Sequence, residues 1–550
     1  MSTWLDWLTQ RAVSSPDEIA LIDGRRQWRY AELNEWATDM AGRLRAAGVS
    51  PGNHVAVLMP NRPEYVCTIH ALARLGAVLV PLNVRLTPGE LRWQMDRADC
   101  AYLLCSRETE GVASQIADCR LQISRSHSAI SNLQSAIRSG SERRADVHRV
   151  LSVDRPEQPG VEALDDFATR AAGFREGRRR DLDEVQCIIF TSGTTGRPKG
   201  AMLTYGNHLA SATASAFRLG TLSGDQWLAC MPLYHVGGLA IVLRCCLYGT
   251  TLVLHGGFDP AAVSSALDTQ AVTLISLAPT MLHRLLEARG RQPFPESLRC
   301  VLLGGAAAPA TLVERSLALG VPVATTYGLT EAASQVATAS PDEVRRKAGA
   351  PSTGPGHFVG KPLMFSQVRI AGEDGQEQPP GEIGNIEVRG PTVMAGYYRR
   401  PEATREALWN GWLRTGDMGY LDEDGDLWVV QRRSDLIVTG GENVYPAEVE
   451  RVLLEHPRLE AACVIGVEDE EWGQRVVAAV VAAEGATLTE AELAAFCRAR
   501  LAGYKQPRGY RFLTSLPQTA SGKVQRDAVA AWLSQDKREM WILRENSGKM

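Results

Sequence analysis

Short apolar runs alternate with amphipathic stretches along much of the chain. Between residues 53 and 105, the runs HVAVLMP, AVLVPLN and CAYLLCS are separated by the stretches EYVCTIHALARLG and PGELRWQMDRA, which have helical spacing. The alternation resumes later with VQCIIF, WLACMPL, TLVLHGG, VTLISLAP, LRCVLLGG and PVATTYG. Strands that alternate with helices form parallel sheets covered by helices, so the pattern predicts an α/β fold.

The pattern changes after Ala350. SQVRIAG, GEIGNIEVRG and GDLWVVQRR read as short strands with glycine turns, which predicts a small β-rich subdomain. The helical patterns PAEVERVLLEH and EAELAAFCRARL then flank the strands AACVIGV and VVAAVVAA, as in a small α+β domain. We therefore expect a large N-terminal domain over residues 1–431, a hinge at 432–435, a C-terminal lid domain at 436–534 and a tail at 535–550.

The length of 550 residues supports more than one domain. Residues 121–150 are rich in serine and arginine and poor in apolar residues, which predicts a surface insertion.

Charge and hydropathy exclude several classes of protein. The 59 basic and 63 acidic residues leave no basic excess for nucleic acid. No apolar run approaches the ~20 residues of a membrane span, and the N-terminus lacks the pattern of a signal peptide. Eleven cysteines without a CxxC pair predict buried, reduced thiols in a cytoplasmic protein.

The most informative segment is TSGTTGRPKG, which directly follows the strand CIIF. Its glycines let the backbone approach a ligand, while its hydroxyls and a lysine suit an oxyanion such as a polyphosphate. The spacing does not fit a Walker A loop. The candidate phosphate-binding residues are Thr191, Ser192, Gly193, Thr194, Thr195, Gly196 and Lys199. A flexible surface turn is the alternative, which the preceding buried strand disfavours.

This decapeptide resembles the phosphate loop of the adenylate-forming superfamily, which includes acyl-CoA synthetases. Three further signatures follow in family order: TYGLTEAAS, GWLRTGDMGYLDEDGDLWVVQRRSDLIVTGGENVYPAEVE and LPQTASGKVQR. The resemblance covers nearly the whole chain. It implies an AMP-forming acid–thiol ligase that uses ATP, Mg²⁺ and coenzyme A to activate a small carboxylic acid.

The resemblance also assigns nucleotide contacts. Tyr327, beside Gly328, would stack on adenine, and Asp417 would accept the ribose hydroxyls. Thr330 and Glu331 would meet the phosphates and Mg²⁺, which prefers hard oxygen ligands. Arg432 would contact the ribose or phosphates, and Gly304, Gly305 and Ala306 would pass close to the nucleotide or form a plain turn.

The remaining catalytic assignments lie toward the C-terminus. Lys523 would reach the acyl carboxylate and the α-phosphate, acting with Glu331 and Lys199. Gly440 and Gly441 would line a pantetheine tunnel. Ser434 departs from the family's usual hinge residue, Lys or Asp, which weakens the hinge assignment but not the reaction.

Three stretches favour a particular acid: MPLYHVGGLAIVLRCCLYG, TEAASQVAT and LNVRLTPGELRWQMDRAD. They resemble the o-succinylbenzoate–CoA ligases of menaquinone biosynthesis, whose acid is an aromatic dicarboxylate. Arg244, on an otherwise apolar segment, would pair the second carboxylate, or else face solvent or a structural acid. His235 would shape the pocket or act as a cap or gate, and Ser334 and Gln335 would add hydrogen bonds.

Other functions stay open at this point. A ligase for another aryl or medium-chain acid keeps every nucleotide motif. A catalytically silent nucleotide-binding module should have lost Lys199, Glu331 or Lys523, and all three are present. A homodimer is compatible with the sequence, which carries no signature for it.

Overall fold

The computed structural model describes residues 3–24, 26–116, 147, 149–167, 179–191, 198–306, 308–348, 356–372, 374–431, 436–483, 485–517, 524 and 526–535. The chain divides into two compact units. One comprises residues 1–84, 91–191 and 199–432, and the other comprises residues 85–90, 192–198 and 433–550. The α/β class is confirmed, whereas the predicted hinge at 432–435 lies outside the described residues and the domain limits stay a prediction.

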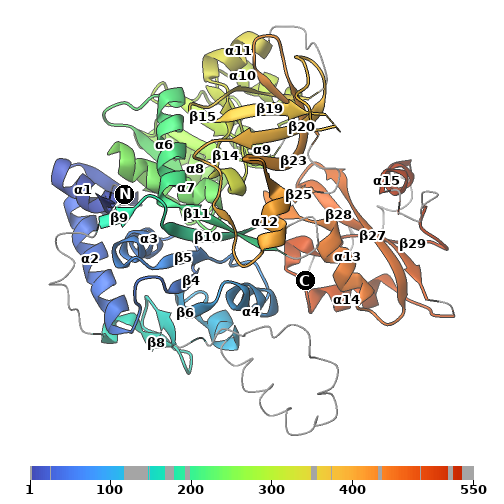
Figure 1. Cartoon of the computed structure of the whole chain (residues 1–550), viewed down its shortest axis with the longest axis horizontal. Coiled ribbons are helices and arrows are strands. Elements are labelled where there is room, and N and C mark those ends of the chain that lie inside the picture. The colour runs from blue at the N-terminus through green and yellow to red at the C-terminus, as the bar shows by residue number, and fades with distance from the viewer. Residues whose placement is uncertain are drawn as a thin grey trace. The chain divides into compact units, whose positions relative to one another are not determined.

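The first unit contains two large mixed sheets (Figure 1). The described strands of one sheet follow the order β21 (Gly396–Tyr397), β11 (Lys199–Thr204), β10 (Val185–Thr191), β5 (Val78–Pro81), β4 (His54–Leu58), β6 (Cys100–Cys105), β7 (Arg149–Ser152) and β8 (Glu162–Ala163). The strands from β10 to β8 are parallel. β10, β11 and β21 are antiparallel, so the phosphate loop joins an antiparallel pair.

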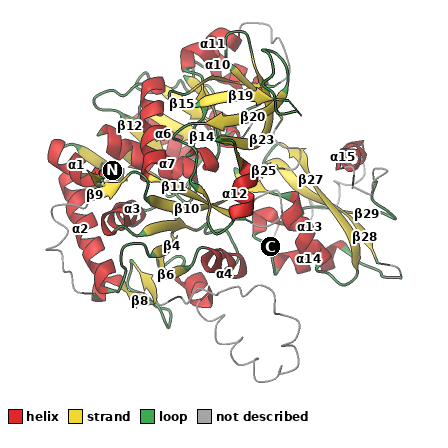
Figure 2. Ribbon diagram, in the orientation of Figure 1, coloured by secondary structure: helices red, strands yellow, loops and turns green. Residues whose placement is uncertain are grey.

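The second sheet has a parallel centre and an antiparallel extension (Figure 2). Its parallel strands lie in the order β16 (Val323–Tyr327), β15 (Cys300–Leu303), β14 (Leu274–Leu277), β12 (Gln226–Ala229), β13 (Thr251–Leu254) and β2 (Ile19–Asp23). The antiparallel strands are β3 (Arg26–Arg29), β17 (Ala337–Thr338), β18 (His357–Pro362), β19 (Gln367–Ala371), β20 (Gly384–Arg389), β22 (Leu408–Trp409), β23 (Trp412–Leu421) and β24 (Leu427–Gln431). A separate pair joins β1 (Thr3–Leu5) to β9 (Arg179–Asp181). The predicted β-rich texture after Ala350 corresponds to β18, β19, β20, β22, β23 and β24, whereas β3 lies at the opposite edge of the sheet.

Helices connect these strands and supply much of the core. They are α1 (Trp7–Ser14), α2 (Tyr30–Ala46), α3 (Pro63–Leu75), α4 (Pro88–Arg97), α6 (Tyr205–Leu219), α7 (Val236–Tyr248), α8 (Pro260–Thr269), α9 (Pro279–Arg289), α10 (Ala310–Ala318), α11 (Pro341–Ala348) and α12 (Pro401–Ala407). The main core joins side chains of both sheets, such as Val57 and Trp227, to α3 and α7. Burying such surface contributes about 25 cal/mol per Å² and is the main favourable term in folding.

The second unit is a small sheet with helices. Its described strands are β26 (Glu442–Val444), β25 (Ile437–Thr439), β28 (Gly473–Ala482), β27 (Leu459–Asp469) and β29 (Tyr510–Phe512), and its helices are α13 (Pro446–Leu454), α14 (Glu490–Arg498) and α15 (Arg526–Gln535). β27 and β28 form a long antiparallel pair, and their inward residues pack with Val529 and Leu533 of α15. The predicted strands and helices of this region are confirmed.

Three sequence expectations meet the structure here. Most of the predicted insertion at 121–150 lies outside the described residues, but Arg149 and Val150 begin β7, and Val150 is buried. The predicted surface insertion stays a prediction, and its last two residues belong to a short strand. The ten described cysteines are all buried and free of disulfides, as expected. None of the described helices combines the length and apolar character needed to cross a membrane.

Candidate active site

The phosphate loop and the TYGLTE motif meet at Glu331. Thr191 ends β10, and its hydroxyl donates a hydrogen bond of 2.9 Å to Oε1 of Glu331. The hydroxyl of Tyr397 donates to the same oxygen, also at 2.9 Å. Lys199 lies opposite Thr191 in the β10–β11 pair, and its ammonium lies 5.2 Å from the centre of the Tyr397 ring. Tyr397 thus contacts both the predicted phosphate-binding lysine and the predicted metal-binding carboxylate.

The donor set around Glu331 suits Mg²⁺. A carboxylate oxygen has two lone pairs, and the two hydroxyl donors use both of those on Oε1. None of the described residues donates a hydrogen bond to Oε2. Thr330 precedes Glu331 in a 3₁₀ turn, so a second oxygen is near in the chain. Mg²⁺ is usually bound by one or two oxygen ligands from the protein, while phosphate oxygens and waters complete its coordination.

The backbone after Glu331 is strained. Ala333 has φ 51° and Ser334 has φ 96°, a region that residues with a Cβ rarely adopt. Gly328 lets this loop close, because a Cβ there would lie 1.5 Å from the carbonyl oxygen of Ser334. Strain of about 1–3 kcal/mol per residue persists only where the surroundings hold it, as they commonly do at functional sites.

Tyr327 and Asp417 are in direct contact, as the sequence alone did not predict. The tyrosine hydroxyl donates a 2.7 Å hydrogen bond to Oδ2 of Asp417, and both side chains are buried. Tyr327 ends β16, while Asp417 lies in the middle of β23. The proposed adenine and ribose contacts therefore come from two parts of one extended sheet.

The glycines after β15 lie at the same edge as Tyr327, because β15 and β16 are parallel neighbours. Gly305 has φ +82°, which favours glycine. A Cβ on Gly304 would lie 2.6 Å from Cγ2 of Thr326, so the close approach to β16 excludes a larger residue. Ala306 continues this turn.

Arg244 is buried in α7 and has no acidic partner among the described residues. Only 2% of its surface is exposed, and burial lowers the pKa of its guanidinium. Its Nη2 donates to Oγ of Ser211 at 3.3 Å, while Nε has no hydrogen-bond partner in the described part of the chain. Ser211 in turn donates to the carbonyl of Ala333 at 2.6 Å. The arginine is thus two hydrogen bonds away from the strained loop that carries Ser334, and it does not face solvent.

The other predicted acyl-pocket residues flank this loop and α7. His235 is the N-terminal cap residue of α7 and lies 4.7 Å from the Tyr234 ring, centre to centre. Gln335 is buried, and its amide nitrogen donates to Oγ1 of Thr338 at 3.0 Å. Its amide oxygen has no hydrogen-bond partner among the described residues.

In the second unit, Gly440 and Gly441 connect β25 to β26. Both have positive φ, 57° and 82°, as the two central residues of a tight hairpin turn require. Near the predicted catalytic lysine, Arg526 donates to the carbonyl of Val464 at 2.6 Å and pairs with Glu450 of α13. Arg526 therefore anchors the first residue of α15 to this sheet and to α13.

Several predicted residues lie outside the part of the chain that the structure describes. They are Ser192, Gly193, Thr194, Thr195, Gly196, Arg432 and Lys523. Their assignments stay predictions.

Sequence reasoning missed Tyr397, Ser211 and Asn207. Tyr397 occurs in AGYYRRPEA, where two adjacent tyrosines after a glycine look like ordinary strand residues. Asn207 donates to the carbonyls of Pro391 and Val393, at 2.8 and 2.9 Å, and so fixes the segment that leads to Tyr397. The one available signal was the spacing of Thr204 and Asn207, which is that of a helix-capping pair.

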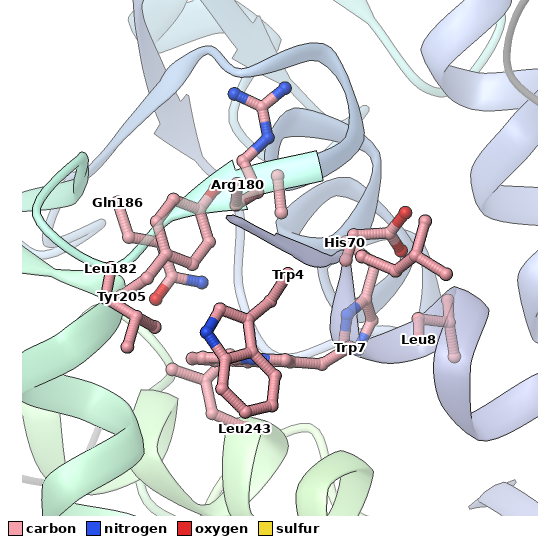
Figure 3. Close-up of a pocket in the computed structure, with 12 residues that line it drawn as sticks. Trp4, Trp7, Leu8, His70, Arg180, Leu182, Gln186, Tyr205 and Leu243 are labelled. Carbon is pink, nitrogen blue, oxygen red and sulfur yellow. The ribbon is translucent and has the colours of Figure 1, made fainter. Parts of the chain in front are cut away.

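A small enclosed cavity lies elsewhere in the first unit (Figure 3). Trp4, Trp7, His70, Arg180 and Tyr205 are among its lining residues, and it includes none of the predicted site residues. Its volume of about 10 Å³ is that of one water molecule. It is too small for a nucleotide or an aromatic acid and belongs to the packing of the N-terminus.

Comparison with known proteins agrees with this geometry. A family model described as AMP-binding enzyme matches residues 8–398, and one for the AMP-binding enzyme C-terminal domain matches residues 448–523. The chain belongs to the AMP-binding enzyme family.

Within this family, the chain is similar to ligases that act on 2-succinylbenzoate. The chain is 44% identical over 526 residues to the 2-succinylbenzoate–CoA ligase of Geobacillus kaustophilus, covering 96% of this chain and 97% of that one. It is 36% identical to a double mutant of o-succinylbenzoate CoA synthetase from Bacillus subtilis bound to a product analogue, with a TM-score of 0.82 and coverage of 96% and 99%. The Bacillus subtilis enzyme in complex with ATP and a magnesium ion is also 36% identical, with a TM-score of 0.68 and coverage of 96% and 100%.

Proposed function

We propose that this chain is an AMP-forming ligase that joins o-succinylbenzoate to coenzyme A in menaquinone biosynthesis. In the first half-reaction, a carboxylate of the acid attacks the α-phosphorus of ATP, giving acyl-AMP and pyrophosphate. In the second, the thiol of coenzyme A attacks the acyl carbon, giving the thioester and AMP. The high identity to 2-succinylbenzoate–CoA ligases over 96% of the chain supports both the reaction and the acid. The buried thiols are compatible with the cytoplasmic location that the sequence predicts.

The nucleotide motifs bind and orient ATP. Tyr327 offers a flat face to adenine, and its bond to Asp417 leaves the second carboxylate oxygen for the ribose hydroxyls. Lys199 and the loop hydroxyls hold the phosphates, and Glu331 with Thr330 would hold Mg²⁺. Bound magnesium neutralises charge on the phosphate oxygens.

The remaining predicted residues complete the two half-reactions. We assign Lys523 to the charge that gathers on the carboxylate and α-phosphate as they approach. Arg432 contributes on the ribose or phosphate side. We assign the Gly440–Gly441 turn to the pantetheine arm, because two residues without side chains leave room for it.

The single structural observation that carries the choice of a dicarboxylate is the burial of Arg244 without an acidic partner among the described residues. Its guanidinium carbon lies 5.8 Å from the centre of the Trp227 ring, which supplies no full counter-charge. A buried charge without a counter-charge costs several kcal/mol, and the carboxylate of the substrate that is not activated would compensate it. His235, Ser334 and Gln335 shape the pocket around the ring.

The test is a panel of acids. The protein, ATP, Mg²⁺ and coenzyme A are incubated with o-succinylbenzoate, benzoate or a medium-chain fatty acid, and thioester and pyrophosphate are measured. We expect o-succinylbenzoate to give the highest kcat/KM. A preference for the fatty or simple aryl acid would overturn the substrate and leave the reaction class, whereas no thioester with any acid would overturn both.

Arg244→Met sharpens this test, since methionine fills a similar volume without charge. We expect KM for o-succinylbenzoate to rise roughly 10- to 100-fold, because a charge-assisted hydrogen bond contributes about 1.5–3 kcal/mol. Benzoate, which has no second carboxylate, should be used as well as before. An equal loss with both acids would assign Arg244 to structure.

A further inference from the structure

One tyrosine contacts both charged groups of the proposed phosphate and metal site. The hydroxyl of Tyr397 donates to Oε1 of Glu331 at 2.9 Å, and the face of its ring lies 5.2 Å from the ammonium of Lys199. An ammonium within about 6 Å of a ring centre is attracted to its negative face. A single side chain therefore contacts a carboxylate through its hydroxyl and an ammonium group through the face of its ring.

The backbone leaves Tyr397 little freedom. β21 pairs with β11, so that Tyr397 faces Ala201 two residues beyond Lys199. The Tyr397 amide donates to Oγ1 of Thr404 at 2.9 Å. Gly396 has φ +136°, and a Cβ there would lie 2.8 Å from Thr404, so the chain packs against α12 as closely as it can.

The neighbouring tyrosine shows that this placement is specific. Tyr398 follows the end of β21 and lies in a turn. Its hydroxyl donates to Asp99 at 2.7 Å, and its ring makes an edge contact with the His54 ring. Tyr397 and Tyr398 are adjacent residues of the same type, but of the two it is Tyr397 that contacts Glu331.

The hydrogen-bond pattern on Glu331 gives the reason for this contact. Thr191 and Tyr397 together saturate Oε1, and none of the described residues donates to Oε2. Two donors on one oxygen fix the rotation of the carboxyl group about its last bond. They present Oε2 to a cation while the ring keeps Lys199 at the phosphates.

We propose that Tyr397 is a positioning residue that orients Glu331 toward Mg²⁺ and holds Lys199 beside it. This inference rests on the proposed function for the identity of the ligands, Mg²⁺ and ATP. The two contacts of Tyr397 can be tested separately. Its hydroxyl orients Glu331 for the metal ion, and its ring positions Lys199 for the phosphates.

Three variants test the proposal. Tyr397→Phe removes the hydroxyl and keeps the ring, Tyr397→Leu removes both, and Tyr398→Phe is the matched control at the next position. Mn²⁺ binding is followed by electron paramagnetic resonance in the presence of a non-hydrolysable ATP analogue. Nucleotide affinity is measured separately, and pyrophosphate exchange is measured against Mg²⁺ concentration.

We expect Tyr397→Phe to weaken Mn²⁺ binding roughly tenfold, as loss of one hydrogen bond to a charged group implies. It should raise the Mg²⁺ concentration for half-maximal exchange by a similar factor, with kcat at saturating Mg²⁺ changed less than threefold. Tyr397→Leu should in addition weaken the analogue about three- to tenfold. Tyr398→Phe should behave as the parent.

The proposal is overturned if the Mn²⁺ titration of Tyr397→Phe overlaps that of the parent, or if Tyr398→Phe shifts it equally. Failure of the proposed function gives a different result. If the parent protein catalyses no pyrophosphate exchange with any acid of the panel, the ligase assignment is contradicted. The metal and nucleotide titrations still decide the role of Tyr397.

Discussion

At the scale of single residues, this site uses short contacts between groups that are far apart in sequence. Thr191 and Glu331 are 140 residues apart, and Tyr327 and Asp417 are 90 apart, yet both pairs are hydrogen-bonded. Each residue type was predictable from its motif, because hydroxyls, a carboxylate and an aromatic ring suit a nucleotide. Which atom donates to which depends on strand order and could not be predicted.

Lys523 gives the sharpest prediction at this scale. Lys523→Ala should slow formation of acyl-AMP by at least roughly 10²–10³-fold, because a charge that stabilises the transition state is removed. Thioester formation from acyl-AMP supplied in solution should be nearly unchanged. The two half-reactions are measured on the same protein, so each is the control for the other. An equal loss in both would contradict the role assigned to Lys523.

At the scale of elements, the start of α6 links helix capping to the site. Asn207 accepts from the amide of Thr204 at 2.8 Å, which closes the helix N-terminus. Its amide nitrogen holds Pro391 and Val393, and the chain then runs to Met394, whose amide donates to the carbonyl of Glu331 at 2.9 Å. The capping pair was visible in the sequence. The hydrogen bond from Asn207 to Pro391 was not visible there, because it joins residues that are 184 positions apart.

Asn207→Ala should therefore cost more than an ordinary cap. We expect a loss of roughly 2–3 kcal/mol in the free energy of unfolding, since a cap and two bonds to backbone carbonyls disappear. The KM for ATP should also rise. Asp259→Ala, at the exposed N-cap of α8, is the matched control and should cost about 1 kcal/mol with no change in KM. Urea unfolding and steady-state kinetics measure both effects, and equal behaviour of the two variants would refute the link.

At the scale of the whole molecule, burial of ionisable groups sets the response to pH. His70 of α3 and His208 of α6 lie in the core of the first unit. Burial lowers the pKa of His70 to about 4 and that of His208 to about 3, and the charge of Arg244 adds to the effect on His208. Both are therefore neutral in the folded protein at pH 7, and both gain a proton more easily when the chain unfolds.

The sign of the effect follows from these pKa values. The unfolded chain binds protons near pH 6.5 and the folded chain does not, so stability is complete above pH 6.5 and falls as the pH drops toward 4. Each histidine contributes up to about 1.4 kcal/mol per pH unit well below pH 6.5, and about half of that at pH 6.5, which makes about 3 kcal/mol for both between pH 6.5 and 5. Urea unfolding at several pH values measures the slope. His208→Gln should reduce it by close to one proton, and an unchanged slope would contradict the prediction.

The sequence by itself determined the alternation of strands and helices, the predicted phosphate loop, and the types of residue predicted to meet ATP. These depend on local spacing and on the chemistry of side chains, which a linear pattern records. Tertiary structure alone decided that Tyr397 shares Glu331 with Thr191, that Arg244 is buried with no acid beside it among the described residues, and that Asn207 holds the segment that leads to Tyr397. Those facts depend on which distant strands become neighbours, and residue spacing along the chain does not encode that.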